Sequence, residues 1–181
     1  MRRLPLRSVT ILALAGLCCA ASVSLDSMKR VEASINDKFK SDINDPYDLM
    51  GTARGSYLPG YGVVFTVEMN VITVPQLMVS PFNPPPTAAA LLQLHDRKIR
   101  KLAVLRETMR GLIAGASQSM PALLPEDNIM MEAFLFNWSW ENVAGVPHRI
   151  VLAANKQKLL DALNRHAAPA EMAALFEDKE L

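Results

Sequence analysis

Basic side chains are concentrated in one short stretch of the chain. Six of the 19 Lys and Arg residues fall within fourteen positions, namely Arg97, Lys98, Arg100, Lys101, Arg106 and Arg110. On a helix, Arg97, Arg100 and Lys101 are expected to share the face opposite the apolar side chains. Arg106 and Arg110 would lie on one flank, whereas Lys98 points into the apolar stripe and would have to extend its amine to solvent. Such a basic ridge could bind an acidic envelope protein, an anionic polymer or lipid headgroups, or it could simply be a solvated helix face.

A further cation lies in a Gly-rich block, GTARGSYLPGYGVVF, at residues 51–65. The guanidinium of Arg54 could hold an anion or a carboxylate there, or could form an internal salt bridge. An enzymatic site around Arg54, Tyr57, Tyr61 and Glu68 is the alternative function that this block suggests. No Gly-x-Ser-x-Gly nucleophile motif is present, so no catalytic residue is assigned. The glycines do not match a phosphate-binding loop and are expected to form turns.

Metal and cofactor chemistry is not expected from this sequence. The three histidines, His95, His148 and His166, are scattered, and no pair has the four-residue spacing of a helical metal site. The two cysteines, Cys18 and Cys19, belong to the amino-terminal segment. We therefore assign no metal ligand and no cofactor.

Residues 1–21 have the pattern of a cleaved secretory signal. Three arginines precede an apolar run at 9–17, and small residues follow up to Ala21. The run is too short to span a bilayer, and no later stretch replaces it as a transmembrane segment. A lipoprotein is disfavoured because Leu17 stands before Cys18 where a small residue would be required. The expected location is the periplasm or the outside of the cell.

Residues 22–181 are expected to form a single domain that carries 16 basic and 18 acidic residues. Export and a slightly negative net charge disfavour nucleic acid as a partner. Without cysteines the domain must be stabilised by burial, which is feasible for 160 residues. The oligomeric state is not specified by the sequence.

Hydrophobic periodicity predicts an α+β fold. Helices are expected at 25–43, with Ser24 as N-cap, at 88–118, with Thr87 as N-cap, at 156–165 and from Pro169 onward. Strands are expected at 53–58, 61–74, 128–140 and 148–154, the first two joined by a turn at Pro59 and Gly60 and the last two forming a hairpin. We therefore expect a two-layer sandwich: an antiparallel or mixed sheet of about four strands packed on the long helix, with further helices at both ends.

Alternation within the strands predicts which side chains form the core. In the strand at 61–74, the residues with apolar side chains at odd positions share one face. In the strand at 128–140, we expect Phe134, Phe136, Trp138 and Trp140 to share a buried face, although exposed rings could instead bind sugars or a partner.

The block at 51–65, the basic helix and the segment FNWSWE at 136–141 together resemble a group of exported bacterial proteins. The resemblance implies a shared fold and an envelope or secreted setting, and it brings no activity with it. The leading hypothesis is therefore an exported, non-catalytic binding module. A carrier of apolar ligands is a third possibility, because the chain has ten methionines and small side chains at 114–116.

Overall fold

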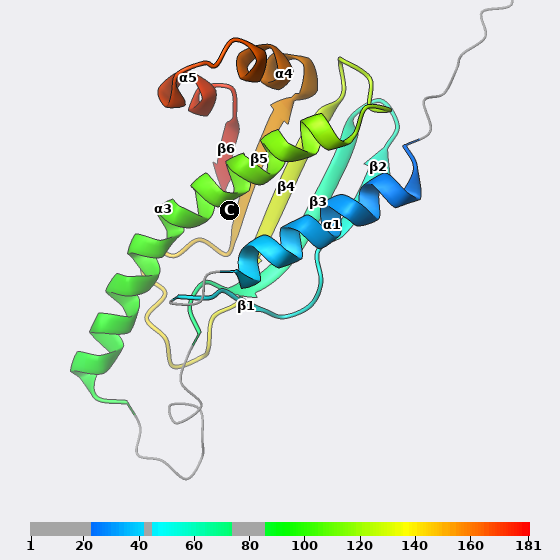
Figure 1. The fold of residues 1–181 in the computed structure, drawn as a ribbon. Helices are drawn as coiled ribbons and strands as arrows, with labels where there is room; N and C mark the ends of the chain where they lie inside the picture. The colour runs from blue at the N-terminus through cyan, green and yellow to red at the C-terminus, as the bar shows by residue number, and fades with distance from the viewer. Residues whose placement is uncertain (1–22, 42–44, 74–85) are drawn as a thin grey trace, which may run out of the picture.

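The computed structural model describes residues 23–41, 45–73 and 86–181, so the expected signal segment lies outside the described residues. The fold is α+β, with a mixed sheet covered on one face by two helices and flanked at one end by two shorter ones (Figure 1). The predicted fold class and the predicted long helix are confirmed.

The sheet has six strands in the described part of the chain. They are β1 (Asp48–Leu49), β2 (Arg54–Leu58), β3 (Gly62–Asn70), β4 (Asn128–Leu135), β5 (Arg149–Asn155) and β6 (Glu177–Glu180). The order is β1-β3-β4-β5-β6, and β2 also pairs with β3. The β3–β4 pairing is parallel and all the others are antiparallel. Both expected hairpins are present, while β1 and β6 were not predicted.

The helices begin where their capping residues place them. They are α1 (Leu25–Lys40), α3 (Ala88–Ser119), α4 (Lys156–Asn164) and α5 (Pro169–Ala173). Ser24 and Thr87 each accept a hydrogen bond from a backbone N–H of the first turn, which satisfies one of the donors left free at a helix start. The helix α3 continues through Gly111 and Gly115 for 32 residues without a break.

The core lies between the sheet and the helices α1 and α3. The strand β3 contributes Val63, Phe65, Val67 and Met69, all nearly inaccessible to solvent. Parallel register places Ile129, Met131, Ala133 and Leu135 of β4 beside them. From α3, Leu102, Leu105, Met109 and Ile113 cover this apolar surface. The predicted core face of β3 is thereby confirmed.

The predicted core face of β4 is wrong. The strand ends at Leu135, and Phe134 is 41% exposed on the uncovered face of the sheet. Side chains alternate along a strand, so burying Phe134 would also have buried the carboxylate of Glu132. Beyond the strand, Trp138 contacts Phe136 edge to face and stacks on Trp140 at 6.4 Å between ring centroids. These three rings are half-buried in a loop rather than aligned in the core.

The helix α1 completes the outer edge of β2. Its Glu32 side chain accepts a hydrogen bond from the backbone N–H of Gly55 at 2.6 Å. One turn further on, Asn36 Oδ1 accepts from the N–H of Ala53 at 2.9 Å. Two side chains spaced four apart on a helix thus satisfy two backbone donors spaced two apart, one in β2 and one just before it.

Gly62, at the start of β3, provides a test of this architecture. Its φ is +127°, and a Cβ there would overlap the backbone of Asn128 on β4. We expect Gly62→Ala to lower the free energy of unfolding by about 3 kcal/mol. Gly111→Ala is the matched control, because that helical glycine faces open space and should gain about 0.5–1 kcal/mol. Urea titrations followed by circular dichroism measure both, and an unchanged midpoint for Gly62→Ala would contradict the close β3–β4 approach.

Candidate functional site

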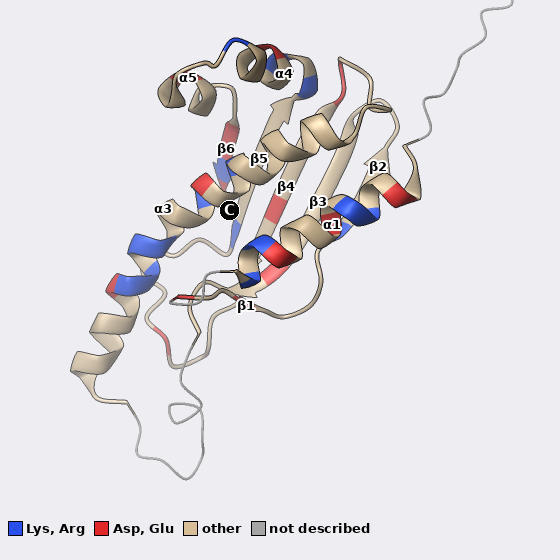
Figure 2. Cartoon of the chain, in the orientation of Figure 1, with Lys and Arg blue, Asp and Glu red and all other residues tan. Residues whose placement is uncertain are grey.

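The basic residues of α3 meet acidic groups from three distant parts of the chain. Figure 2 shows the blue segments of α3 and the red residues of β6 that flank its middle turns. Because ion pairing inside the fold competes with binding of an external anion, the partners of each cation decide what the ridge can do.

Lys98 is buried in a polar cluster rather than extended to solvent. Its side chain is 2% exposed, and its Nζ forms an ion pair with Glu141, whose side chain is 3% exposed. The amine also donates to Asn137 Oδ1 at 2.8 Å. Asn70 donates from Nδ2 to the other Glu141 oxygen at 3.3 Å. The expectation that Lys98 reaches solvent is therefore wrong, because buried partners satisfy its donors where it lies.

Burial lowers the pKa of Lys98 below its ordinary value of 10.5, while the Glu141 carboxylate opposes that shift. The cluster fastens α3 to the loop after β4, and His95 reinforces it through a 3.0 Å hydrogen bond between Nδ1 and the carbonyl oxygen of Asn142. The Lys98–Glu141 pair therefore acts as a structural ion pair.

Arg97 and Lys101 share one carboxylate. Arg97 lies 2.5 Å from Asp45 Oδ1, and Lys101 Nζ lies 2.9 Å from the same oxygen. Lys101 also donates to the Pro46 carbonyl and sits 4.1 Å from the centre of the Tyr47 ring. Burial opposes the charged form of Asp45, but the hydrogen bonds from Arg97 and Lys101 outweigh it and hold its pKa below the ordinary value. Lys101 was expected on the exposed face, yet its side chain is only 5% exposed because the 45–47 segment covers it.

Arg106 and Arg110 pair with the last strand. Arg106 contacts Asp178 at 3.5 Å and also Glu180, while Arg110 contacts Asp178 at 3.2 Å and Glu107 at 2.5 Å. Arg100 is exposed and makes no ion pair or hydrogen bond with the residues that the structure describes. Five of the six ridge residues are thus held by internal partners, which leaves little of the ridge for an external anion.

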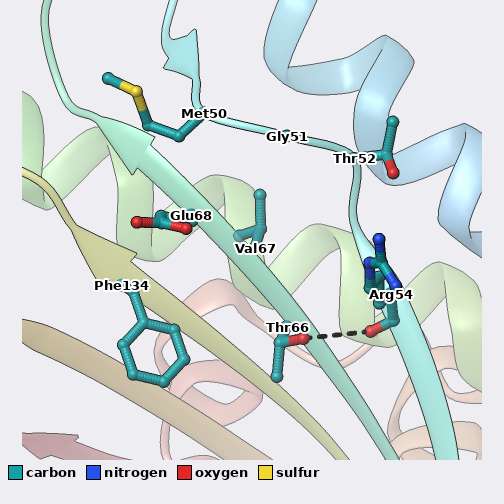
Figure 3. A pocket seen from close by; sticks show the side chains of 8 residues that line it. All are labelled: Met50, Gly51, Thr52, Arg54, Thr66, Val67, Glu68 and Phe134. Carbon is teal, nitrogen blue, oxygen red and sulfur yellow. Dashed lines mark hydrogen bonds between the residues drawn. The ribbon is translucent and has the colours of Figure 1, made fainter.

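The other candidate lies on the uncovered face of the sheet, at a hollow of about 360 Å³ (Figure 3). Its walls come from β2, β3, β4 and the segment before β2, through Met50, Gly51, Thr52, Arg54, Thr66, Val67, Glu68 and Phe134. Glu68 lies between Met50 and Phe134, and Arg54 lies beside Thr52 on the neighbouring strand. Thr66 donates a 3.4 Å hydrogen bond to the Arg54 carbonyl.

Two opposite charges line this hollow, and both side chains are exposed to solvent. Neither the Arg54 guanidinium nor the Glu68 carboxylate has a hydrogen-bond or ion-pair partner among residues 23–41, 45–73 and 86–181. The register pairs Arg54 with Thr66, so Glu68 is its diagonal neighbour, at about 7–8 Å between such positions. The Phe134 ring adds an apolar wall and lies 5.7 Å from the Arg149 guanidinium carbon.

The structure separates the residues of the suggested enzymatic site. Arg54 and Glu68 line one hollow, but Tyr57 lies on the helix-covered face and packs against the core. Tyr61 borders a different hollow of about 180 Å³ with Asn128 and Glu177, five to seven residues along β3, or about 16–23 Å away. Burial, with a smaller contribution from Glu177, raises the pKa of Tyr61 above 10.0.

Thr66 was not predicted as a site residue, and Phe134 was considered for binding only as the alternative to a buried aromatic face. The signal for Thr66 was available in the wetter face of β3, which alternates Val64, Thr66 and Glu68. An exposed position for Phe134 was not expected, because large aromatic side chains are usually buried in the core.

The described part of the chain also bears on metal ligands and on the small residues of α3. No group of three or more His, Cys, Asp or Glu side chains there could hold a metal ion. The small residues at 114–116 border two surface grooves of about 130 and 240 Å³ against α1 and α5.

Comparison with known proteins finds no protein-family model, curated protein or solved structure that matches this chain. Among the described helices, none combines the length and the apolar character needed to cross a membrane. The fold and the two charges of the hollow are therefore the basis for assigning a function.

The Lys98–Glu141 pair gives a prediction about stability. We expect Lys98→Met to lower the free energy of unfolding by about 3–5 kcal/mol, because it leaves a buried carboxylate unpaired. Adding Glu141→Leu should recover most of that loss. Arg165→Met removes the half-exposed Arg165–Glu171 pair and should cost less than about 1 kcal/mol. Chemical denaturation of the wild type and these three variants tests the prediction, and equal losses for Lys98→Met and Arg165→Met would rule out a structural role for the buried pair.

Proposed function

We propose that the chain is an exported, non-catalytic binding domain of the cell envelope or the extracellular medium. Its site is the hollow between Arg54 and Glu68, and its ligand is an extended peptide segment of a partner protein. The observation that carries the proposal is a pair of exposed opposite charges on adjacent strands, which have no partner among the described residues and lie beside an exposed aromatic ring.

The spacing of the two positions matches an extended peptide. Diagonal neighbours such as Arg54 and Glu68 lie about 7–8 Å apart in an antiparallel pair. In an extended peptide, side chains two residues apart lie on one side at about 6.6–6.8 Å. An acidic and a basic residue at positions i and i+2 can therefore meet Arg54 and Glu68 together.

The composition of the walls supports the same ligand. Phe134 and Met50 offer an apolar surface next to the charges, and both are about 40% exposed. Aromatic rings and arginine are the side chains that recur at protein-binding surfaces. Binding through the basic ridge of α3 is less well supported, because five of its six residues are already paired.

Peptide selection tests the binding site. We expect a displayed peptide library to yield sequences with an acidic and a basic residue two positions apart. Arg54→Glu should weaken the selected peptides by about tenfold or more, because like charges then face each other. Lys158→Glu, an exposed lysine on α4, is the control and should leave binding unchanged. Selections without this spacing, or equal affinities for the two variants, would refute the site.

Export is tested separately, by the mass of the mature protein. We expect protein recovered from the periplasm or the medium of its host to begin at Ser22, after cleavage at Ala21. Leu14→Lys should keep the protein inside the cell, because a charge interrupts the apolar run that the export machinery binds. Recovery of wild-type protein only from the cytoplasm, with residues 1–21 still attached, would contradict export.

A further inference from the structure

The methionines in the described part of the chain differ widely in exposure. Met130 and Met172 are half-buried, and among the described methionines only Met50 is exposed, at 40%. The others are buried, namely Met28, Met69, Met109, Met120 and Met131. A peroxide must reach the sulfur atom before it can oxidise a methionine. Among these residues, Met50 is therefore the one expected to react first.

The side chain of Met50 belongs to the Arg54–Glu68 hollow. Its backbone N–H donates a 2.9 Å hydrogen bond to the carbonyl oxygen of Glu68, which fixes the residue beside β3. The Glu68 carboxylate lies between the Met50 side chain and the Phe134 ring (Figure 3). The exposed sulfur is thus part of the surface that the proposed peptide would contact.

A basic side chain of the peptide would pass these two apolar groups to reach Glu68. The methylene groups of lysine and arginine pack on apolar surface while the charged head stays in a polar environment. Met50 and Phe134 provide such a surface on either side of the carboxylate. A change that makes Met50 polar therefore removes part of the apolar wall without removing either charge of the hollow.

We propose that Met50 is an oxidation site, and that its oxidation by a peroxide weakens peptide binding in the hollow. The effect on binding rests on the proposed function, whereas the oxidation itself rests only on the exposure and position of Met50. Export, as proposed above, would place the site outside the reducing cytosol.

The reaction needs no group other than the oxidant. The sulfur lone pair attacks one oxygen of hydrogen peroxide, the O–O bond breaks, and an S–O bond forms. The sulfur is oxidised by two electrons and the peroxide is reduced. The departing hydroxide takes the proton of the transferred oxygen and leaves as water. The product is a polar sulfoxide, which methionine sulfoxide reductases convert back to the thioether, so the change is reversible.

Mapping of the oxidised residues tests the modification. The folded protein is treated with dilute hydrogen peroxide, and each methionine is followed over time by digestion and mass spectrometry. We expect the gain of one oxygen atom to be at least about threefold faster at Met50 than at Met130 or Met172. In urea-unfolded protein the three should react at similar rates, because the fold no longer protects any of them. Equal rates at Met50 and Met130 in the folded protein would overturn the proposal.

Affinity for a selected peptide, compared before and after peroxide within each protein, tests the effect on binding. For the wild type we expect Kd to rise about five- to tenfold, because apolar contact at Met50 is lost, and to recover after treatment with reductases for both sulfoxide epimers. Met50→Leu should show no change on oxidation, since leucine has no sulfur. Met130→Leu is the matched control: it removes a half-buried sulfur from the same face of the sheet and should keep the wild-type sensitivity.

The outcomes separate this inference from the proposed function. Oxidation at Met50 with an unchanged peptide affinity, or a peroxide effect that persists in Met50→Leu, would overturn the effect on binding while leaving the peptide site intact. Failure to select any peptide would refute the peptide site and its regulation together, and the mapping experiment would still decide whether Met50 is the oxidation site.

Discussion

The parallel pairing of β3 with β4 is the constraint on which the remaining structure depends. Two parallel neighbours cannot be joined by a tight turn, so the chain must return along the full length of the sheet between them. The helix α3 makes that return. A strand of nine residues such as β3 is about 30 Å long, whereas the 32 residues of α3 extend about 48 Å. The helix is therefore longer than the strands it covers, and the excess extends past the sheet.

The part of α3 that extends past the sheet explains which partners its basic residues have. A helix that leaves the sheet loses its apolar counterpart, and here the segments around Asp45 and Glu141 pack against it instead. Basic side chains on that part of α3 are matched by acids from those segments and, nearer the middle, by Asp178 of β6. Most of the basic residues of α3 thus form ion pairs with acidic residues elsewhere in the fold. The uncovered face of the sheet, by contrast, keeps two exposed charges, Arg54 and Glu68, that have no partner in the described part of the chain.

Local patterns predicted much of the fold, and long-range partners account for what they missed. Thr87 and the apolar repeat located α3, and clean alternation located β3 and its core face. The four charged residues of β6 have no alternation, because the strand is held by backbone pairing and by arginines about 70 residues away. The inner face of β4 was misassigned because aromatic size outweighed the position of Glu132. In the candidate site, Arg54 and Glu68 were both recognisable from sequence, but only the β2–β3 register shows that they are neighbours.

The two edges of the sheet are closed by different means. The outer strand β6 is charged throughout, which discourages another strand from adding to it. On the other side, the donors of Ala53 and Gly55 are satisfied only because Asn36 and Glu32 of α1 reach them. Displacing α1 would therefore cost more than its apolar contacts, because it would also expose the backbone donors of a strand edge to other molecules. We therefore expect the resistance of this protein to edge-to-edge assembly at high concentration to depend on how firmly α1 stays docked.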